Sequence, residues 1–268
     1  MSYAVRSLSV GTFEEPGPAV FWMRHWDVWI SLRLQLILIQ GHGRTILINT
    51  ALPDDLGPLR KEYPGAIMWG EPGTRGAITR ASEELQLPAL AAAGITPADV
   101  TDIILTPIVR YTTDTLDQFP AARIHVSKRG WVHFHITHDH PHDSRGAFPR
   151  DSLVHLVTDG WPRVHLLDDE HEIAPGLRTW HSGVHHRSSI VVEVDTADGI
   201  VAISDSFFVY ENVEDGIPLG LNESFEEMVA TNARVNRTAN HIIPLYDHRV
   251  FDRYPGGIIA PGRLAGTH

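Results

Sequence analysis

Short apolar segments separated by turn residues recur along this chain and constrain its fold more than any other feature. Residues 32–39 alternate at first and are rich in leucine and isoleucine, and residues 45–49 follow after the turn 41–43 (GHG). Segments of this length and composition are typical of strands. Further strands are predicted at residues 102–105, 124–126, 164–167, 178–181, 190–194, 200–203 and 242–243, and helices at residues 78–93, 96–99, 128–136, 224–236 and 250–254.

These strands and helices occur in two similar halves, which suits an α/β fold with four layers, an αββα sandwich of two facing sheets with helices outside. Pro88 is expected to kink or break the helix at 78–93, and residues 53–76, rich in Pro and Gly, are expected to be loop or broken helix. No linker is long enough to split the chain, so a single domain over residues 1–268 is expected.

The composition excludes several classes of function. A formal net charge of -11 argues against a nucleic-acid or anionic-membrane partner, because phosphate binding requires a basic face. The chain has no cysteine, which excludes disulfides, thiolate metal sites and cysteine nucleophiles and suits a cytoplasmic protein. Residues 1–15 do not have the pattern of a signal peptide, and the apolar stretch at 32–39 is too short to span a bilayer.

Five short motifs occur in a fixed order. The predicted strand 101–106 (TDIILT) ends in a threonine and is followed by 107–112 (PIVRYT) and 116–120 (LDQFP). The others are 49–51 (NTA), 181–185 (HSGVH), 202–206 (AISDS) and 243–247 (IPLYD). In this order and spacing the chain resembles the metallo-β-lactamase superfamily, above all its lactonase-like branch. The resemblance implies an αββα sandwich of the metallo-β-lactamase type, with the site on loops that follow strands at one edge.

The same resemblance shows which metal ligands have been replaced. The family's HxHxDH cluster follows the threonine, and here those ligand positions hold Pro107, Val109, Tyr111 and Thr112. The final histidine of a PGHD-like motif is replaced by Tyr246. Only two of the family's seven ligand positions keep a ligand-type residue. They are His185, in the motif that resembles HTPGH, and Asp205, in the motif that resembles AGDA.

A catalytic zinc needs about three protein ligands and an open position for water. We therefore expect no normal dinuclear zinc centre, and two alternatives stay open. In the first, one divalent ion, zinc or iron, binds His185 and Asp205, with His186 as a further imidazole, polarises a carbonyl and lowers the pKa of bound water. In the second, the site works without metal: Arg110 or Tyr111 stabilises an oxyanion, and Asp205 orients His185 as a base.

A histidine-rich segment offers a further candidate for metal binding. It contains His133, His135, His138, His140 and His142, together with Asp139. The spacing matches no known zinc signature, so a substitute metal set and an ordinary solvated polar loop both remain as interpretations.

Aromatic residues cluster twice. Phe21, Trp22, Trp26 and Trp29 lie near the N-terminus, and Phe207, Phe208 and Tyr210 closely follow Asp205. Each cluster alone is more typical of a core or a dimer face, but together they would suit an apolar small-molecule pocket. Trp26, His186, Phe207 and Tyr246 are accordingly candidate substrate-binding residues.

The sequence thus favours a small-molecule hydrolase that cleaves a lactone, ester or related acyl bond at an atypical site, with catalytic candidates His185, Asp205, Arg110 and Tyr111. A non-catalytic or metal-free descendant that binds a small ligand or a regulatory partner is the alternative, and a mononuclear iron site is a third. The expected partner is a small molecule. A homodimer is also considered, since relatives in the lactonase-like branch are often dimeric.

Overall fold

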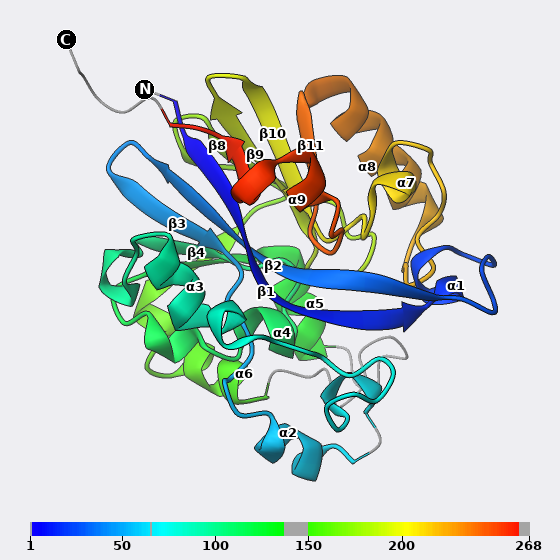
Figure 1. Cartoon of the computed structure of the whole chain (residues 1–268). Helices are drawn as coiled ribbons and strands as arrows, with labels where there is room; N and C mark the ends of the chain where they lie inside the picture. Colours follow the sequence, from blue (N-terminus) through cyan, green and yellow to red (C-terminus); the bar gives the residue numbers. More distant parts are fainter. Residues whose placement is uncertain (1, 65, 137–149, 263–268) are drawn as a thin grey trace.

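The computed structural model describes residues 2–64, 66–136 and 150–262. Two sheets pack face to face with helices on their outer sides (Figure 1), which confirms the predicted αββα sandwich. The first sheet has the strand order β12-β1-β2-β3-β4-β5-β6 and the second β11-β10-β9-β8-β7. The strands are β1 (Ala4–Pro16), β2 (Trp29–Gly41), β3 (Arg44–Ile48), β4 (Asp102–Ile104), β5 (Arg123–Ser127), β6 (Val164–Leu167), β7 (Glu170–Ala174), β8 (Leu177–His181), β9 (Ile190–Thr196), β10 (Gly199–Ser204), β11 (His241–Pro244) and β12 (Ile258–Ala260).

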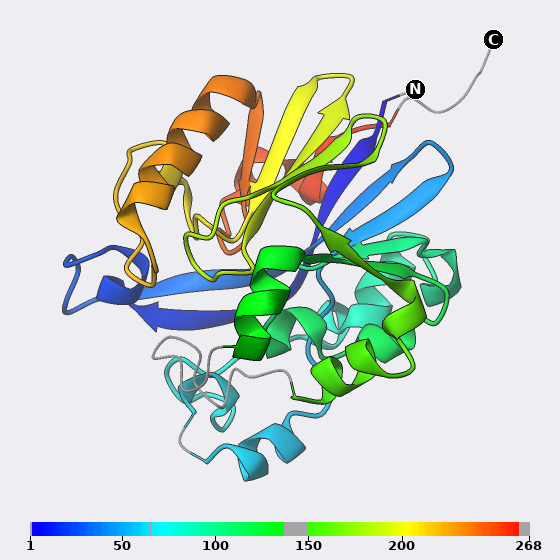
Figure 2. The same cartoon turned by 180° about the vertical axis from the view of Figure 1, so that it is seen from behind.

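Helices cover both outer faces, as the view from behind also shows (Figure 2). They are α1 (Gly17–Val20), α2 (Gly57–Glu62), α3 (Gln86–Ala92), α4 (Arg110–Thr113), α5 (Lys128–Ile136), α6 (Arg150–Val157), α7 (Tyr210–Val213), α8 (Phe225–Thr238) and α9 (Val250–Arg253). The helix predicted at 78–93 is shorter than expected. Its residues 78–81 are not helical, and Pro88 lies in the first turn of α3, where a missing N–H costs nothing.

The antiparallel hairpin of β1 and β2 is the longest element and extends well beyond the sandwich, with α1 near its end (Figure 1). Strand β2 was predicted from the sequence, whereas β1 was not. The reason is a bulge between Ser9 and Gly11, which shifts the register and interrupts the in–out alternation that identifies a strand.

Strands β3 to β6 pair in parallel, so their carboxyl ends meet at one edge of the first sheet. Two of the loops at this edge are joined through a side-chain amide. Asn49 Nδ2 donates to the Thr106 carbonyl, and Thr106 N donates to Asn49 Oδ1, both at 2.8 Å. Asn49 has φ 66°, in the left-handed region that asparagine tolerates better than most residues. These two hydrogen bonds fix the position of Thr106, which follows β4.

Helix α8 covers the outer face of the second sheet. Ser224 caps it by accepting the Glu227 N–H, as the predicted helix start requires. Its Val235 packs in a cluster with Trp180, Val191 and Ala202 from strands β8, β9 and β10. This packing holds the loop after β10, which carries Asp205, against the rest of the fold.

Candidate functional site

Asp205 lies at the carboxyl end of β10 and is fully buried. The Thr106 hydroxyl donates to one of its carboxylate oxygens and the Ser189 hydroxyl donates to the other. Each hydroxyl is itself held by a backbone N–H at 3.0 Å, from Ile190 on Thr106 and from His186 on Ser189. Burial raises the pKa of the Asp205 carboxyl, and the two hydroxyls oppose that rise. Both oxygens that a bridging carboxylate would offer to metals are therefore engaged within the protein.

His185 and His186 lie beside one another, with ring centroids 4.0 Å apart. The Nδ1 atom of His185 is 2.9 Å from the Leu221 carbonyl oxygen. A carbonyl only accepts, so Nδ1 carries the proton, and in the neutral ring Nε2 bears the lone pair. The ring of Phe208 meets His185 edge-on at 4.7 Å. The predicted histidine pair is thus present, in a buried aromatic setting.

Tyr246, at the position of the missing last histidine, continues this aromatic cluster. Its ring meets Phe208 at 4.7 Å, Tyr111 at 6.2 Å and Phe13 at 6.4 Å, each edge-on. Burial raises the pKa of Tyr246 well above its usual value, and the neighbouring Tyr111 and Asp205 raise it further. The phenol stays neutral at physiological pH, and a neutral phenol is a poor metal ligand.

The residues at the positions of the HxHxDH cluster stabilise a backbone turn. The Thr112 hydroxyl lies 2.6 Å from the Pro107 carbonyl and 2.8 Å from the Val109 carbonyl. Val109 is buried and precedes α4 in extended conformation. These contacts close the first turn of α4 through the protein's own backbone.

The donor set therefore does not fit the metal centre that the fold family implies. Among the residues that the structure describes, no group of three or more His, Cys, Asp or Glu side chains could hold a metal ion. Of the ligand positions that the resemblance implies, only those of His185 and Asp205 hold a ligand-type residue, and the carboxylate of Asp205 is hydrogen-bonded on both oxygens. The predicted single-ion site stays a prediction. Of the histidine-rich segment, His138, His140 and His142 lie outside the described residues, and the His135 ring packs on Trp131 at 4.7 Å.

Arg110, predicted to stabilise an oxyanion, is buried and engaged elsewhere. Its guanidinium forms an ion pair with Asp114 at 3.2 Å, donates to the Tyr63 hydroxyl at 2.8 Å and lies 4.9 Å from the centre of the Tyr63 ring. Burial raises the pKa of Asp114 to about 6 in spite of the guanidinium, which lowers it. Tyr111, the next residue, instead contacts the cluster around Tyr246.

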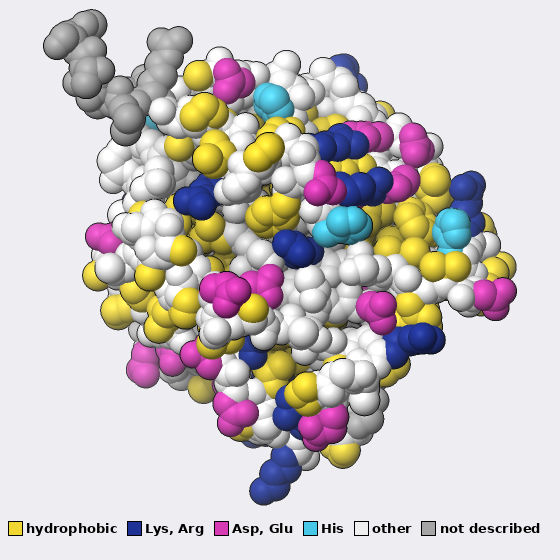
Figure 3. Space-filling view, in the orientation of Figure 1, with side chains coloured by type: hydrophobic (Ala, Val, Ile, Leu, Met, Phe, Trp, Pro, Cys, Tyr) yellow, Lys and Arg dark blue, Asp and Glu magenta, His cyan; other side chains and the backbone are white. Residues whose placement is uncertain are grey.

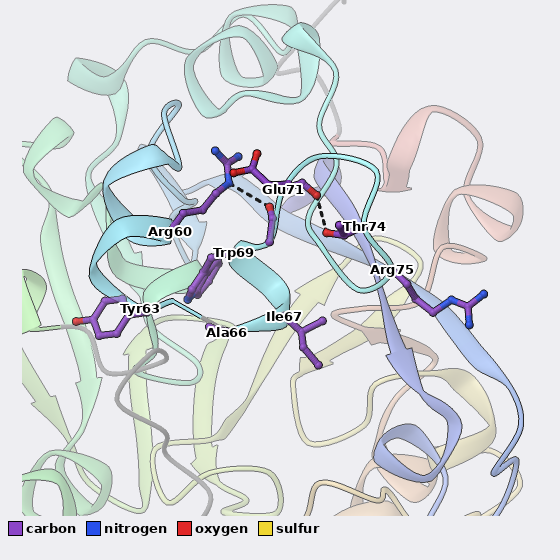
Figure 4. A pocket seen from close by; sticks show the side chains of 9 residues that line it. Arg60, Tyr63, Ala66, Ile67, Trp69, Glu71, Thr74 and Arg75 are labelled. Carbon is purple, nitrogen blue, oxygen red and sulfur yellow. Dashed lines mark hydrogen bonds between the residues drawn. The ribbon is translucent and has the colours of Figure 1, made fainter.

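A pocket of about 380 Å³ adjoins Tyr63. It is enclosed by α2 and the turns up to residue 75, where Arg60 Nε donates to the Gly70 carbonyl and the Thr74 hydroxyl to the Glu71 carbonyl, at 3.1 and 2.6 Å (Figure 4). Its walls include Trp69, which is buried, and Ile67, which is exposed. Neither His185 nor Asp205 lines the pocket.

The N-terminal aromatic cluster forms the projecting end of the β1–β2 hairpin. Trp26 is 66% exposed, and Trp22 and Met23 are also exposed, so hydrophobic side chains gather there (Figure 3). The hairpin end is tied to residues 218–221, because Trp22 N donates to the Pro218 carbonyl and Leu221 N to the Ala19 carbonyl, each at 2.8 Å. The Leu221 carbonyl in turn accepts a hydrogen bond from His185, so the backbone of residues 218–221 connects the hairpin end with the histidine pair.

The residues of the second aromatic cluster, which follow Asp205, lie in two different environments. Phe207, the predicted substrate-binding residue, packs beneath α8 in the cluster with Trp180, and it is Phe208 that contacts His185. Neither Thr106 nor Ser189 was predicted from the sequence as a partner of Asp205. In the sequence each is only a polar residue next to a motif. Polar residues are common in such loops, so this feature does not identify a partner of Asp205.

The architecture is the metallo-β-lactamase fold. The chain is similar to an N-acyl homoserine lactone hydrolase, solved with the product N-hexanoyl-L-homoserine at its catalytic metal centre, with a TM-score of 0.75 and 15% identity over 94% of this chain and 96% of that one. It is also similar to AidC, a dizinc quorum-quenching lactonase, with a TM-score of 0.63 and 14% identity over 88% and 83% of the two chains.

A third similar structure is a putative metallo-β-lactamase from Thermotoga maritima, with a TM-score of 0.53 and 16% identity over 92% of this chain and all of that one. At such identities the likeness establishes the fold alone. No family model and no curated protein matches the sequence. In the part of the chain that the structure describes, no helix is long and apolar enough to cross a membrane.

Proposed function

We propose that this protein is a metal-independent member of the fold that binds a small acyl compound, such as a lactone or ester with an apolar tail. The observation that carries the proposal is the state of Asp205, whose two carboxylate oxygens accept hydrogen bonds from Thr106 and Ser189. If a metal took the place of those bonds, the buried Ser189 hydroxyl would lose its acceptor, at a cost of about 1–3 kcal/mol, and the Thr106 hydroxyl would keep only the Ile190 carbonyl at 3.2 Å.

The ligand class follows from the surroundings of the histidine pair. The hairpin end exposes aromatic side chains and is linked through the backbone of Leu221 to His185, whose ring packs on Phe208. Aromatic walls with a few polar groups are the usual lining of a small-molecule site. A neutral acyl compound suits this lining better than a charged one, because the net charge of -11 disfavours anions.

Hydrolysis of the same ligand is the second candidate, favoured by the tautomer of His185. With Nδ1 protonated against Leu221, its Nε2 is the basic nitrogen. It would take a proton from water as the water oxygen bonds to the acyl carbon. The carbon–oxygen bond of the lactone then breaks, and the proton passes to the departing alkoxide.

One experiment on untagged protein distinguishes binding alone, hydrolysis and a metal-dependent site. Metal content is measured by mass spectrometry, binding of N-hexanoyl-L-homoserine lactone by calorimetry, and ring opening by acid release, each with and without EDTA. We expect binding without stoichiometric metal. Ring opening that resists EDTA and is lost in His185→Gln would establish the second candidate. About one metal per chain, with binding abolished by EDTA, would refute metal independence.

A further inference from the structure

The projecting end of the β1–β2 hairpin and the start of α8 form one apolar surface. The hairpin end lies beside the amino end of α8 (Figure 1), and the Trp22 ring meets Phe225 edge-on at 5.1 Å. Val229 lies one helical turn after Phe225, on the same face of α8. We call this surface the hairpin patch. Its large hydrophobic side chains are each 42–66% exposed: Trp22, Met23, Trp26, Val28, Phe225 and Val229.

The hairpin patch is large for a surface that only water covers. A large side chain has roughly 200 Å² of surface, so exposed fractions of this size leave roughly 600 Å² of apolar surface. The largest apolar patch on a typical monomer is about 300–600 Å², and a stable complex buries about 800 Å² per partner, a little over half of it apolar. The hairpin patch alone can therefore supply the apolar part of a standard interface.

The backbone of the hairpin end holds these side chains in fixed directions. Met23 and His25 have φ 57° and 56°, in the left-handed region that residues other than glycine seldom adopt. Val28 N donates to the His25 carbonyl at 3.1 Å, and the Val28 carbonyl accepts from Gly17 N at 2.7 Å. Backbone strain of this kind clusters at functional positions, and a tip that is already ordered loses little conformational entropy when it binds a partner.

The charges of the hairpin end indicate which partner the hairpin patch suits. Residues 22–28 contain one arginine, Arg24, and one carboxylate, Asp27, and both are exposed. Neither side chain forms an ion pair with another described residue. The tip thus carries balanced charge in a chain of net charge -11, so two copies can meet there without bringing like charges together. A lipid surface would instead desolvate the Asp27 carboxylate without giving it a partner.

We propose that the hairpin patch binds the hairpin patch of a second copy of this chain, in an isologous interface about a two-fold axis. The apolar side chains form the centre of the interface, and Arg24 of each copy pairs with Asp27 of the other. The inference goes beyond the proposed function and does not depend on the ligand. Because Trp22 bonds to the backbone of residues 218–221, the second copy also restrains the segment whose Leu221 carbonyl accepts from His185.

Analytical ultracentrifugation of the untagged chain, at concentrations up to about 100 μM, tests this interface. We expect a dimer whose population rises with concentration. Trp26→Glu and Val229→Glu, one substitution on each element, should each weaken it at least about thirtyfold, because the centre of an interface does not tolerate an unpaired charge. Leu87→Glu is the matched control: Leu87 is 41% exposed on α3, away from the hairpin patch, and this variant should dimerise like wild type.

A charge exchange tests the two-fold arrangement. Arg24→Asp alone and Asp27→Arg alone each place like charges across the axis and should weaken the dimer. The double variant restores opposite charges at both contacts and should recover most of the wild-type affinity. A double variant that dimerises no better than the single ones overturns the two-fold arrangement.

The remaining outcomes decide the identity of the partner. Dimerisation of wild type and Leu87→Glu that is lost in Trp26→Glu and Val229→Glu supports the inference. Wild type that stays monomeric at every concentration overturns it, and so does a dimer that both glutamate variants retain while circular dichroism shows them folded. A monomer that co-sediments with phosphatidylcholine vesicles also overturns it, because the hairpin patch would then bind lipid instead of a second copy.

Discussion

Replacing Arg110 by methionine tests whether this residue serves the stability of the fold or the chemistry of a site. Its ion pair with Asp114 is buried, with side chains 3% and 5% exposed and the charged atoms 3.2 Å apart. At an effective dielectric constant of about 20, two charges at that distance attract by about 5 kcal/mol. Breaking one partner of a buried pair typically costs about 3–5 kcal/mol, because the other charge stays buried. Loss of the contact with Tyr63 adds about 1 kcal/mol.

The loss in free energy of unfolding that we expect for Arg110→Met depends on pH, because Asp114 titrates. Its pKa, about 6, is above the unfolded value of 3.8, so its contribution to stability falls as the pH rises through that interval. Without Arg110 the pKa rises further. We expect Arg110→Met to lower the free energy of unfolding by about 4 kcal/mol at pH 8 and by about 1–2 kcal/mol at pH 5, where Asp114 is protonated.

Urea unfolding followed by circular dichroism at both pH values measures these losses, and the double variant Arg110→Met/Asp114→Asn is the control. With both charges removed, the loss at pH 8 should fall below about 2 kcal/mol. A loss that is equal at pH 5 and pH 8, or a double variant as unstable as the single one, would refute the reasoning.

Two further predictions concern other buried carboxylates. Asp102 accepts from Arg44 at 3.0 Å and from His125 at 2.9 Å, and these partners lower its pKa, so its stabilisation is present above the unfolded pKa and is lost as the pH falls. Asp102→Asn should cost about 3–5 kcal/mol at pH 7 and about 1 kcal/mol less at pH 3, where the carboxyl is largely protonated in the unfolded state but still ionised in the folded state; urea unfolding at the two pH values checks this, and equal losses would contradict it. Ser189→Ala, which removes a donor to Asp205, should cost about 2–3 kcal/mol, whereas Ser182→Ala, whose hydroxyl shares a neutral bond with Ser206 at 2.6 Å, should cost about 1 kcal/mol. Thermal and urea unfolding of the pair decides this, and equal losses would show that Asp205 carries no charge.

Side-chain periodicity and chemistry were sufficient for much of the fold. Apolar patterns located β2 and β3, and the helix predicted at 224–236 corresponds to α8, because such patterns depend only on neighbours along the chain. Local patterns did not predict the bulge in β1 or the start of α3 at Gln86. In both cases backbone pairing with distant residues decides the conformation.

For the candidate site too, some features follow from the sequence and others only from the tertiary structure. The sequence by itself determined that Pro107, Val109 and Thr112 offer no imidazole or carboxylate, since no fold changes the donor atoms of a side chain. Only the tertiary structure decided that Thr106 and Ser189, from loops far apart in the chain, meet on the two oxygens of Asp205. A buried carboxylate must find hydrogen-bond donors, and which donors reach it depends on how the two sheets bring their loops together.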